Sequence, residues 1–283
     1  MFFSKAKKEA LKIHERAVEK YNETYVKMQT EGENLYRIRQ KSLELIEEIE
    51  SLINSIANSP KDFEAKLENI RKERMKFRKT EEYARQAYDD AVKSGVSMAA
   101  GIAGGAAVAS MAPSVAMWVA TTFGTASTGT AISALHGAVA TKAALAWLGG
   151  GALSVGGGGI AAGKALLALA GPVGWYIAGV ATGASALFLT SKNQATAKEA
   201  MDQAKEITMA GACLNETCAK IQTLSEETSK LFYPLVSFNK EMTKLFGADY
   251  MALDSDDKAK LGTLVNNALA LTALVNRKIE NED

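Results

Sequence analysis

The chain has 283 residues, with 33 Lys and Arg against 32 Asp and Glu, and a formal net charge of +1. This length accommodates one large or two ordinary domains, and so balanced a charge gives no reason to expect a nucleic-acid partner. The two cysteines, Cys213 and Cys218, lie five residues apart on a predicted helix, whereas neighbours on one helix face are three or four apart. We therefore expect two reduced thiols in a cytosolic protein.

Charge is distributed very unevenly along the sequence. Residues 1–93 hold 20 basic and 18 acidic side chains, and residues 192–283 hold 11 and 14. Between them, residues 94–191 contain two lysines, Lys142 and Lys164, no acid, and 19 of the 23 glycines. We therefore divide the chain into an N-terminal charged helical arm (1–93), a hydrophobic, membrane-competent helical region (94–191) and a C-terminal helical arm (192–283) that completes the bundle.

The N-terminal arm begins MFFSKAKKEALK, which lacks the apolar stretch of a secretory signal, so we expect synthesis in the cytoplasm. From Tyr21 onward apolar residues recur in two heptad phases, which predicts a long helix packed along a seam. It should end near Asn58-Ser59-Pro60, because proline disfavours helix at the residue before it. A second helix is expected from about Lys61 to Lys93. The seam positions are Tyr21, Met28, Leu35, Ile49 and Ile56, with Ile38, Leu45 and Leu52, and then Phe63, Leu67, Ile70, Phe77, Ala84, Tyr88 and Ala91.

The middle region contains apolar segments of the length that a bilayer requires. A hydrocarbon core about 30 Å thick needs roughly 20 apolar residues of helix. Val96–Phe123 is uncharged over a longer span, with Pro113 as an expected kink. After a turn at Gly124–Thr130, Ala131–Leu148 is shorter and more amphipathic, and Ile160–Thr190 is apolar again. The sequence therefore predicts short helices that can enter a membrane.

Two groups of residues in the middle region are candidates for function. Bulky apolar side chains would contact lipid, with the three tryptophans near the membrane interfaces, and glycines would form hinges or allow helices to pack closely. The candidate membrane-inserting residues are Met98, Ile102, Val108, Met111, Val115, Trp118, Val119, Leu145, Trp147, Leu148, Leu166, Leu169, Val173, Trp175, Ile177, Leu187, Phe188 and Leu189. The candidate packing and hinge residues are Gly101, Gly105, Gly156, Gly157, Gly158, Gly159, Gly163, Gly179 and Gly183.

The segment Gly158–Lys164 nearly matches a phosphate-binding loop. That motif needs a serine or threonine after its lysine to hold Mg²⁺, and Ala165 stands there instead. It also needs an acidic metal partner, which the uncharged middle region does not supply. The two histidines, His14 and His136, are far apart in the sequence. We therefore expect no nucleotide, no cofactor, no metal ion and no catalytic residues, and hence no enzyme.

The C-terminal arm repeats the heptad pattern. A third seam over Ile207–Leu245 predicts a long helix, which Pro234 should kink or break, and a fourth seam over Leu261–Ile279 follows a plausible N-cap at Asp254-Ser255. The basic run Arg71–Lys79 could contact phosphate, but a solvated helix face is the better interpretation because acidic and apolar residues interleave with it. The sequence thus predicts an all-α fold, an elongated bundle of four or five long antiparallel helices with a central Gly/Ala-rich hydrophobic hairpin region.

This layout resembles that of the α-helical pore-forming toxins, such as cytolysin A and the haemolysin BL components. The resemblance rests on the seams at Leu35–Ile56, Phe63–Ala91 and Ile207–Leu245, which flank Val96–Thr190. It implies a soluble form with a sheltered hydrophobic segment, followed by membrane insertion and oligomerisation. The apolar region here is long enough for about four short helices, whereas those toxins typically expose one hairpin or tongue.

These observations lead to one expected function and two alternatives. We expect a membrane-inserting helical protein, pore-forming or membrane-disrupting, whose partners are the lipid bilayer and further copies of itself or a related helical chain. Such a protein would be membrane-associated in its active state. A constitutive integral membrane scaffold or sensor with coiled-coil arms is one alternative. A soluble helical interaction module that keeps its hydrophobic hairpin buried is the other.

Overall fold

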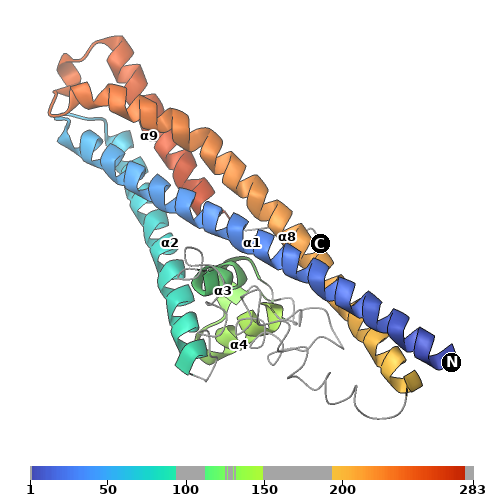
Figure 1. Ribbon diagram of the computed structural model, residues 1–283. Coiled ribbons are helices and arrows are strands. Elements are labelled where there is room, and N and C mark those ends of the chain that lie inside the picture. The colour runs from blue at the N-terminus through green and yellow to red at the C-terminus, as the bar shows by residue number, and fades with distance from the viewer. Residues whose placement is uncertain are drawn as a thin grey trace. The chain divides into compact units, whose positions relative to one another are not determined.

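A computed structural model describes residues 2–93, 112–124, 126, 130, 132–148 and 193–277. Helices make up most of these residues and no strand occurs among them, so the predicted all-α fold is confirmed. The chain divides into two compact units. Unit 1 combines Met1–Gly32 with Glu82–Ala219, and unit 2 combines Glu33–Glu81 with Lys220–Asp283. Three long helices, α1, α2 and α8, each contribute residues to both units (Figure 1).

The end of the first helix and the start of the second lie close to the positions expected from the sequence, whereas the first helix begins at Phe2, well before the predicted seam starts at Tyr21. Helix α1 spans Phe2–Ser55 and α2 spans Lys61–Lys93. Between them, Asn58 has a φ of 55°, a left-handed conformation that asparagine tolerates better than most residues. Pro60 lies directly before α2, where its fixed φ suits a helix start. Local sequence therefore accounts for this helix–turn–helix connection.

Helix α8 spans Asn193–Met242 and continues through Pro234. Of the kink or break predicted at this proline, the break is therefore wrong and the kink stays a prediction. A proline in a helix interior costs about 3 kcal/mol. The flanking side chains of Phe232 and Leu235 are 7% and 2% exposed, and full burial of each such side chain contributes roughly 1.5–3 kcal/mol. Tertiary packing on both sides of the proline offsets the lost backbone hydrogen bond.

Short turns connect α8 to the last helix. The 3₁₀ turns η3 (Thr243–Leu245) and η4 (Tyr250–Ala252) precede α9, which spans Ser255–Asn276. The Asp254 carboxylate accepts a 2.8 Å hydrogen bond from the backbone N–H of Asp257. It thereby satisfies one of the N–H groups that a helix start leaves without a partner, and the predicted N-cap is confirmed.

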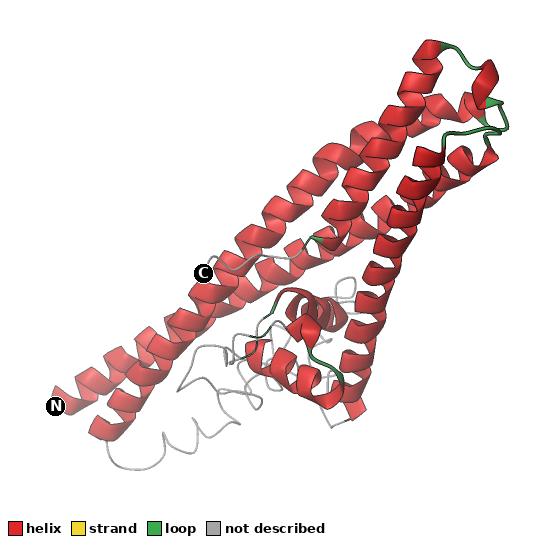
Figure 2. Ribbon diagram, turned by 180° about the vertical axis from the view of Figure 1, so that it is seen from behind, coloured by secondary structure: helices red, strands yellow, loops and turns green. Residues whose placement is uncertain are grey.

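Unit 2 contains parts of α1, α2 and α8 together with the whole of α9 (Figure 2). Its core contains most of the heptad positions predicted from the sequence, together with Leu264 and Leu271, which the predicted seams did not include. The polar side chains of Thr228 and Thr272 interrupt those seams and are fully buried, and each donates a 2.7 Å hydrogen bond to the carbonyl four residues earlier. The fully buried apolar positions include Leu35, Ile49, Ile70, Ile221, Met242, Leu261, Leu264, Val265, Ala268, Leu271 and Val275.

At one end of unit 2, the α1–α2 connection meets the α8–α9 connection. The backbone N–H of Ala57 donates to the carbonyl oxygen of Ala248 at 2.9 Å, and the N–H of Tyr250 donates back to the Ala57 carbonyl oxygen at 2.9 Å. The Asn58 amide donates to both carboxylate oxygens of Asp249, at 3.0 and 3.1 Å. These bonds join segments about 190 residues apart and fix the register of the two helical hairpins.

Unit 1 pairs the first part of α1 with the first part of α8, and both views show these two segments side by side (Figures 1 and 2). Gly211 of α8 lies against Tyr21, and a Cβ at this glycine would stand 3.7 Å from the Tyr21 ring. Ala200 and Ala204 of α8 are each 2% exposed. Small residues on this face of α8 let the two helices approach closely.

Unit 1 also contains the described part of the middle region. Helix α3 spans Ala112–Phe123, the 3₁₀ turn η2 spans Ile132–Ala134, and α4 spans Gly137–Leu148. Pro113 is the second residue of α3. The kink predicted at this residue concerned the whole of Val96–Phe123, of which residues 96–111 lie outside the described residues, so it stays a prediction.

Candidate membrane-inserting site

Helices α3 and α4 pack against each other and against η2. Met117 and Val119 of α3, Ile132 of η2, and Ala140 and Ala144 of α4 are each fully buried. The two alanines are four residues apart and so lie on one face of α4. Small side chains there allow the larger residues of α3 to pack closely. These buried apolar side chains form the core of this part of the middle region, which we call the α3–α4 module.

An aromatic pair covers one side of that core. The Trp118 and Phe123 rings meet edge to face with centroids 5.5 Å apart, a geometry worth about 0.5–1.5 kcal/mol beyond the area buried. The two side chains are 3% and 7% exposed. The adjacent hydroxyl of Thr121 is also buried, and it donates a 2.7 Å hydrogen bond to the Met117 carbonyl oxygen. The polar atom is thus accommodated within the apolar surface of α3.

Backbone hydrogen bonds close the connection between α3 and η2. The N–H of Ile132 donates to the Gly124 carbonyl oxygen at 2.9 Å, and the N–H of Ala126 donates to the Thr130 carbonyl oxygen at 2.8 Å. Gly137 then begins α4 with a φ of +59°, a conformation that residues with a side chain adopt only at a cost. The described residues of the predicted turn at Gly124–Thr130 therefore form a compact loop.

The α3–α4 module contacts the part of α2 that belongs to unit 1. The ring of Tyr83 on α2 meets the ring of His136 edge to face, with centroids 6.4 Å apart. Burial raises the pKa of the Tyr83 phenol. Among the described residues, neither the Tyr83 hydroxyl nor the buried hydroxyl of Thr122 has a hydrogen-bond partner. Each such buried group costs about 1–3 kcal/mol, and for Tyr83 this cost lies at the contact with α2, which is therefore less stable than an apolar equivalent would be.

The structure places only some of the candidate membrane-inserting residues. Trp118 and Val119 are buried in the α3–α4 module. Val115 lies within α3, and Leu145, Trp147 and Leu148 lie within α4. The other membrane-inserting candidates lie outside the described residues, namely Met98, Ile102, Val108, Met111, Leu166, Leu169, Val173, Trp175, Ile177, Leu187, Phe188 and Leu189. The candidate packing and hinge glycines also lie outside them, namely Gly101, Gly105, Gly156, Gly157, Gly158, Gly159, Gly163, Gly179 and Gly183.

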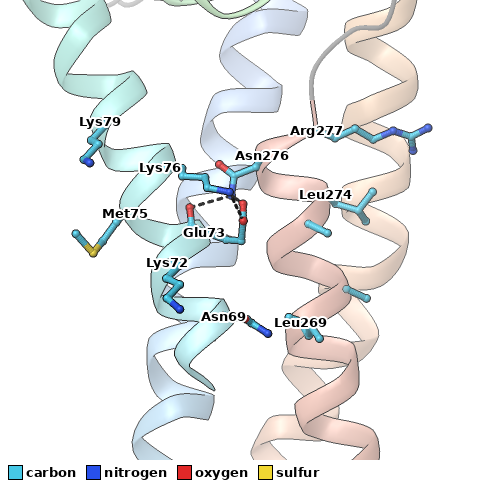
Figure 3. A pocket seen from close by; sticks show the side chains of 12 residues that line it. Asn69, Lys72, Glu73, Met75, Lys76, Lys79, Leu269, Leu274, Asn276 and Arg277 are labelled. Carbon is cyan, nitrogen blue, oxygen red and sulfur yellow. Dashed lines mark hydrogen bonds and ion pairs between the residues drawn. The ribbon is translucent and has the colours of Figure 1, made fainter. Parts of the chain in front are cut away.

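Unit 2 carries a second feature that the sequence did not reveal, a groove of about 1240 Å³ between α2 and α9 (Figure 3). The helix α2 contributes Asn69, Lys72, Glu73, Met75, Lys76 and Lys79, and α9 contributes Leu269, Ala270, Ala273, Leu274 and Asn276, followed by Arg277. The spacing of the three lysines along α2 was visible in the sequence. The residues of α9 that complete the groove lie about 200 positions later, and periodicity alone does not pair two helices.

The basic run Arg71–Lys79 is divided between two roles. Its arginines face α1, where Arg71 and Arg74 bind the Glu50 carboxylate and Arg78 binds Glu47 at 2.6 Å. The Arg74 and Glu50 side chains are 20% and 13% exposed. The lysines of the same run line the groove. The lysines are exposed, as expected for a solvated helix face, whereas Arg74 is half-buried against Glu50.

Other chemistry is limited in the described part of the chain. Cys218 is a buried free thiol, and burial raises its pKa, so this thiol is a weak nucleophile. No cluster of His, Cys, Asp and Glu suited to a metal ion occurs among the described residues. Within the same residues, no helix combines the length and the apolar character needed to cross a bilayer.

Neither a known protein family nor a curated protein nor a solved structure matches this sequence.

Proposed function

We propose that this chain is a non-enzymatic, membrane-inserting helical protein that forms pores or disrupts bilayers as an oligomer. Its charged arms act as an elongated antiparallel bundle that keeps the protein folded in water. The uncharged region 94–191 is the part that enters the bilayer. The observation that carries the proposal is the segregation of charge, because 98 consecutive residues contain two lysines and no acid between two densely charged arms.

The burial of Trp118 and Val119 supports a sheltered form of this segment. These are the candidate lipid-contacting residues whose side-chain surroundings the structure describes, and they are 3% and 0% exposed. Moving such side chains from one apolar environment to another costs little, since the hydrophobic effect depends on removal of apolar area from water. A bilayer can therefore replace the interior of unit 1 as the surroundings of this segment.

The contact between the α3–α4 module and α2 is a suitable point of release. The hydroxyl of Tyr83 at this contact is buried without a partner among the described residues, and release would return it to water or to a new partner. The contact at Tyr83 and His136 would then have to open before the module reaches a membrane. Insertion should therefore depend on the freedom of the module to leave α2.

A reversible tether between these two residues tests the proposal. In a chain with Cys213→Ala and Cys218→Ala, the substitutions Tyr83→Cys and His136→Cys would be joined by a reducible bismaleimide, because the two rings lie 6.4 Å apart. Flotation and dye release would be measured with phosphatidylcholine–phosphatidylglycerol vesicles. We expect the tethered protein neither to float nor to release dye, and a reductant to restore both activities.

The matched control carries the same linker within one helix. Glu82→Cys and Gln86→Cys are exposed positions four residues apart on α2, so a tether between them does not restrain the module. If the protein tethered at 83 and 136 releases dye as fast as this control, separation from α2 is not required. Absence of flotation and leakage in every form would favour the soluble interaction module, and a need for detergent throughout would favour the constitutive membrane protein.

A further inference from the structure

We propose that the groove between α2 and α9 binds an acidic amphipathic helix of a partner protein. The groove belongs to unit 2, whereas the proposed membrane-inserting region belongs to unit 1. The proposal therefore goes beyond membrane insertion and does not rest on it.

The lining residues form two parallel stripes that suit a helix. On α2, Asn69, Lys72, Lys76 and Lys79 follow a spacing of three, four and three, which places them on one face. On α9, residues 270, 273 and 274 are three and four positions apart and so also share one face, and Arg277 follows directly after the helix. The ten steps from Asn69 to Lys79 extend roughly 15 Å at 1.5 Å per residue, about three helical turns. A bound helix of similar length would lie along both stripes.

The base of the groove is apolar and has room for larger side chains. Ala270 and Ala273 are exposed on α9, and their short side chains leave space that a partner's Leu or Phe would fill. Met75 on the opposite side is 58% exposed, and its flexible thioether adapts to differently shaped apolar partners. Apolar anchors spaced along one face of a helix are the usual occupants of such a groove.

The charge around the groove selects an acidic partner. Four basic side chains line it, those of Lys72, Lys76, Lys79 and Arg277, against the single carboxylate of Glu73. That carboxylate already accepts a 3.2 Å hydrogen bond from the Asn276 amide, as Figure 3 shows. Three of these exposed cations pair with carboxylates, Lys72 with Glu68, Lys76 with Glu73 and Arg277 with Glu227. Ion pairs of exposed cations contribute little stability, so carboxylates of a partner can compete for them.

The exposure of the lining argues against a small-molecule site. Pockets for small ligands enclose most of the surface of the ligand. Here Asn69, Lys72, Met75, Lys76 and Ala273 are all exposed, so the groove would cover one side of an occupant only. A helix can bury one face in this way and keep its other face in water.

The test is a selection followed by a charge swap. A display library of 18-residue helices with a fixed leucine stripe and Glu or Lys at the flanking positions would be selected on the full-length chain. Binding of the enriched peptides would be measured by fluorescence anisotropy. We expect Glu-flanked peptides to bind at least tenfold more tightly than Lys-flanked ones. The double variant Lys76→Glu, Lys79→Glu should reverse this preference, and Ala273→Gln, which fills the groove with an exposed polar side chain, should weaken binding about tenfold.

The control pair Lys41→Glu, Lys230→Glu makes the same change in net charge at exposed positions outside the groove and should leave binding unchanged. Circular dichroism and thermal unfolding would verify that every variant folds. The proposal is overturned if no peptide is enriched, or if enriched peptides bind the groove variants and the wild type equally. Anionic vesicles that bind in place of peptides, or a dimer that Ala273→Gln abolishes, would likewise overturn it and assign the groove to a membrane or to a second copy.

Discussion

The Arg39 guanidinium in α1 donates a 2.7 Å hydrogen bond to the main-chain carbonyl oxygen of Arg277, the residue that caps the end of α9. It also donates to the carbonyl oxygen of Leu274 at 3.3 Å. Arg39 is 1% exposed. Burial lowers the pKa of its guanidinium to about 9, so the group still carries its charge at neutral pH. The C-terminal end of a helix has carbonyls without hydrogen-bond partners and bears a partial negative charge. The Arg39 cation donates to two of these carbonyls and offsets that charge.

Truncation of Arg39 should therefore destabilise unit 2 and loosen the end of α9. We expect Arg39→Ala to lower the free energy of unfolding by about 2–5 kcal/mol, because it opens a buried cavity and leaves two carbonyls without their donor. Arg39→Met keeps most of the aliphatic volume and should cost about 1–3 kcal/mol through the lost hydrogen bonds. Urea unfolding measures both values, and hydrogen exchange should accelerate in the last turn of α9. An Arg39→Met protein as stable as the wild type would mean that burial of the charge cancels the benefit of the cap.

The contact between Asn58 and Asp249 makes a prediction about pH. The hydrogen bonds from the Asn58 amide, followed by the bond from the backbone N–H of Met251, lower the pKa of the Asp249 carboxyl. Its contribution to stability is therefore present above the usual Asp pKa of about 3.9 and is lost as the pH falls further. We expect Asn58→Gly to raise the pKa of Asp249 towards that usual value, as measured by carboxyl-carbon NMR titration. An unchanged pKa would assign the shift to the backbone bond alone.

The backbone at Asn58 distinguishes two substitutions that remove the same amide. Glycine adopts the observed φ of 55° without strain, whereas alanine does not. We therefore expect Asn58→Ala to be less stable than Asn58→Gly by up to about 1 kcal/mol. Thermal unfolding of the two proteins side by side gives this difference. Equal stability would indicate that the turn can relax away from the left-handed conformation.

The unpartnered hydroxyls of Tyr83 and Thr122 predict a gain in stability on removal. Tyr83→Phe and Thr122→Val keep the shape of each side chain and remove one buried polar atom, so each should stabilise unit 1 by about 1 kcal/mol. If release of the α3–α4 module limits membrane insertion, the double variant should also release vesicle dye several-fold more slowly. Faster leakage from the stabilised protein would contradict this order of events.

Single charges in the middle region should separate folding from insertion. An aspartate at the centre of a membrane helix costs about 2.5–3.5 kcal/mol on insertion scales. We therefore expect Val115→Asp and Ile177→Asp to abolish vesicle flotation, while the far-ultraviolet circular dichroism of the helical arms is retained. Glu216→Asp, on the exposed surface of α8, provides a control with no added charge. Wild-type flotation of both aspartate variants would exclude these segments from the bilayer.

The sequence by itself determined the all-α class, the end of α1 and the start of α2, the cap at Asp254 and most of the buried heptad positions. These features depend on neighbours within one or two helical turns, so periodicity, proline and capping residues are sufficient to predict them. The sequence also defined the uncharged middle region and its candidate residues. What that region does stays a prediction until membrane binding is measured.

Only the tertiary structure decided how segments far apart in the chain meet. It shows α8 continuous through Pro234, because buried neighbours outweigh a local preference. It places Arg39, which reads as an ordinary surface residue in the sequence, at the buried end of α9. It also joins residues 69–79 to residues 269–277 in one groove. The physical reason is the same in each case: burial and hydrogen bonding between distant segments depend on which helices pack together, and a periodic pattern identifies a packing face without identifying its partner.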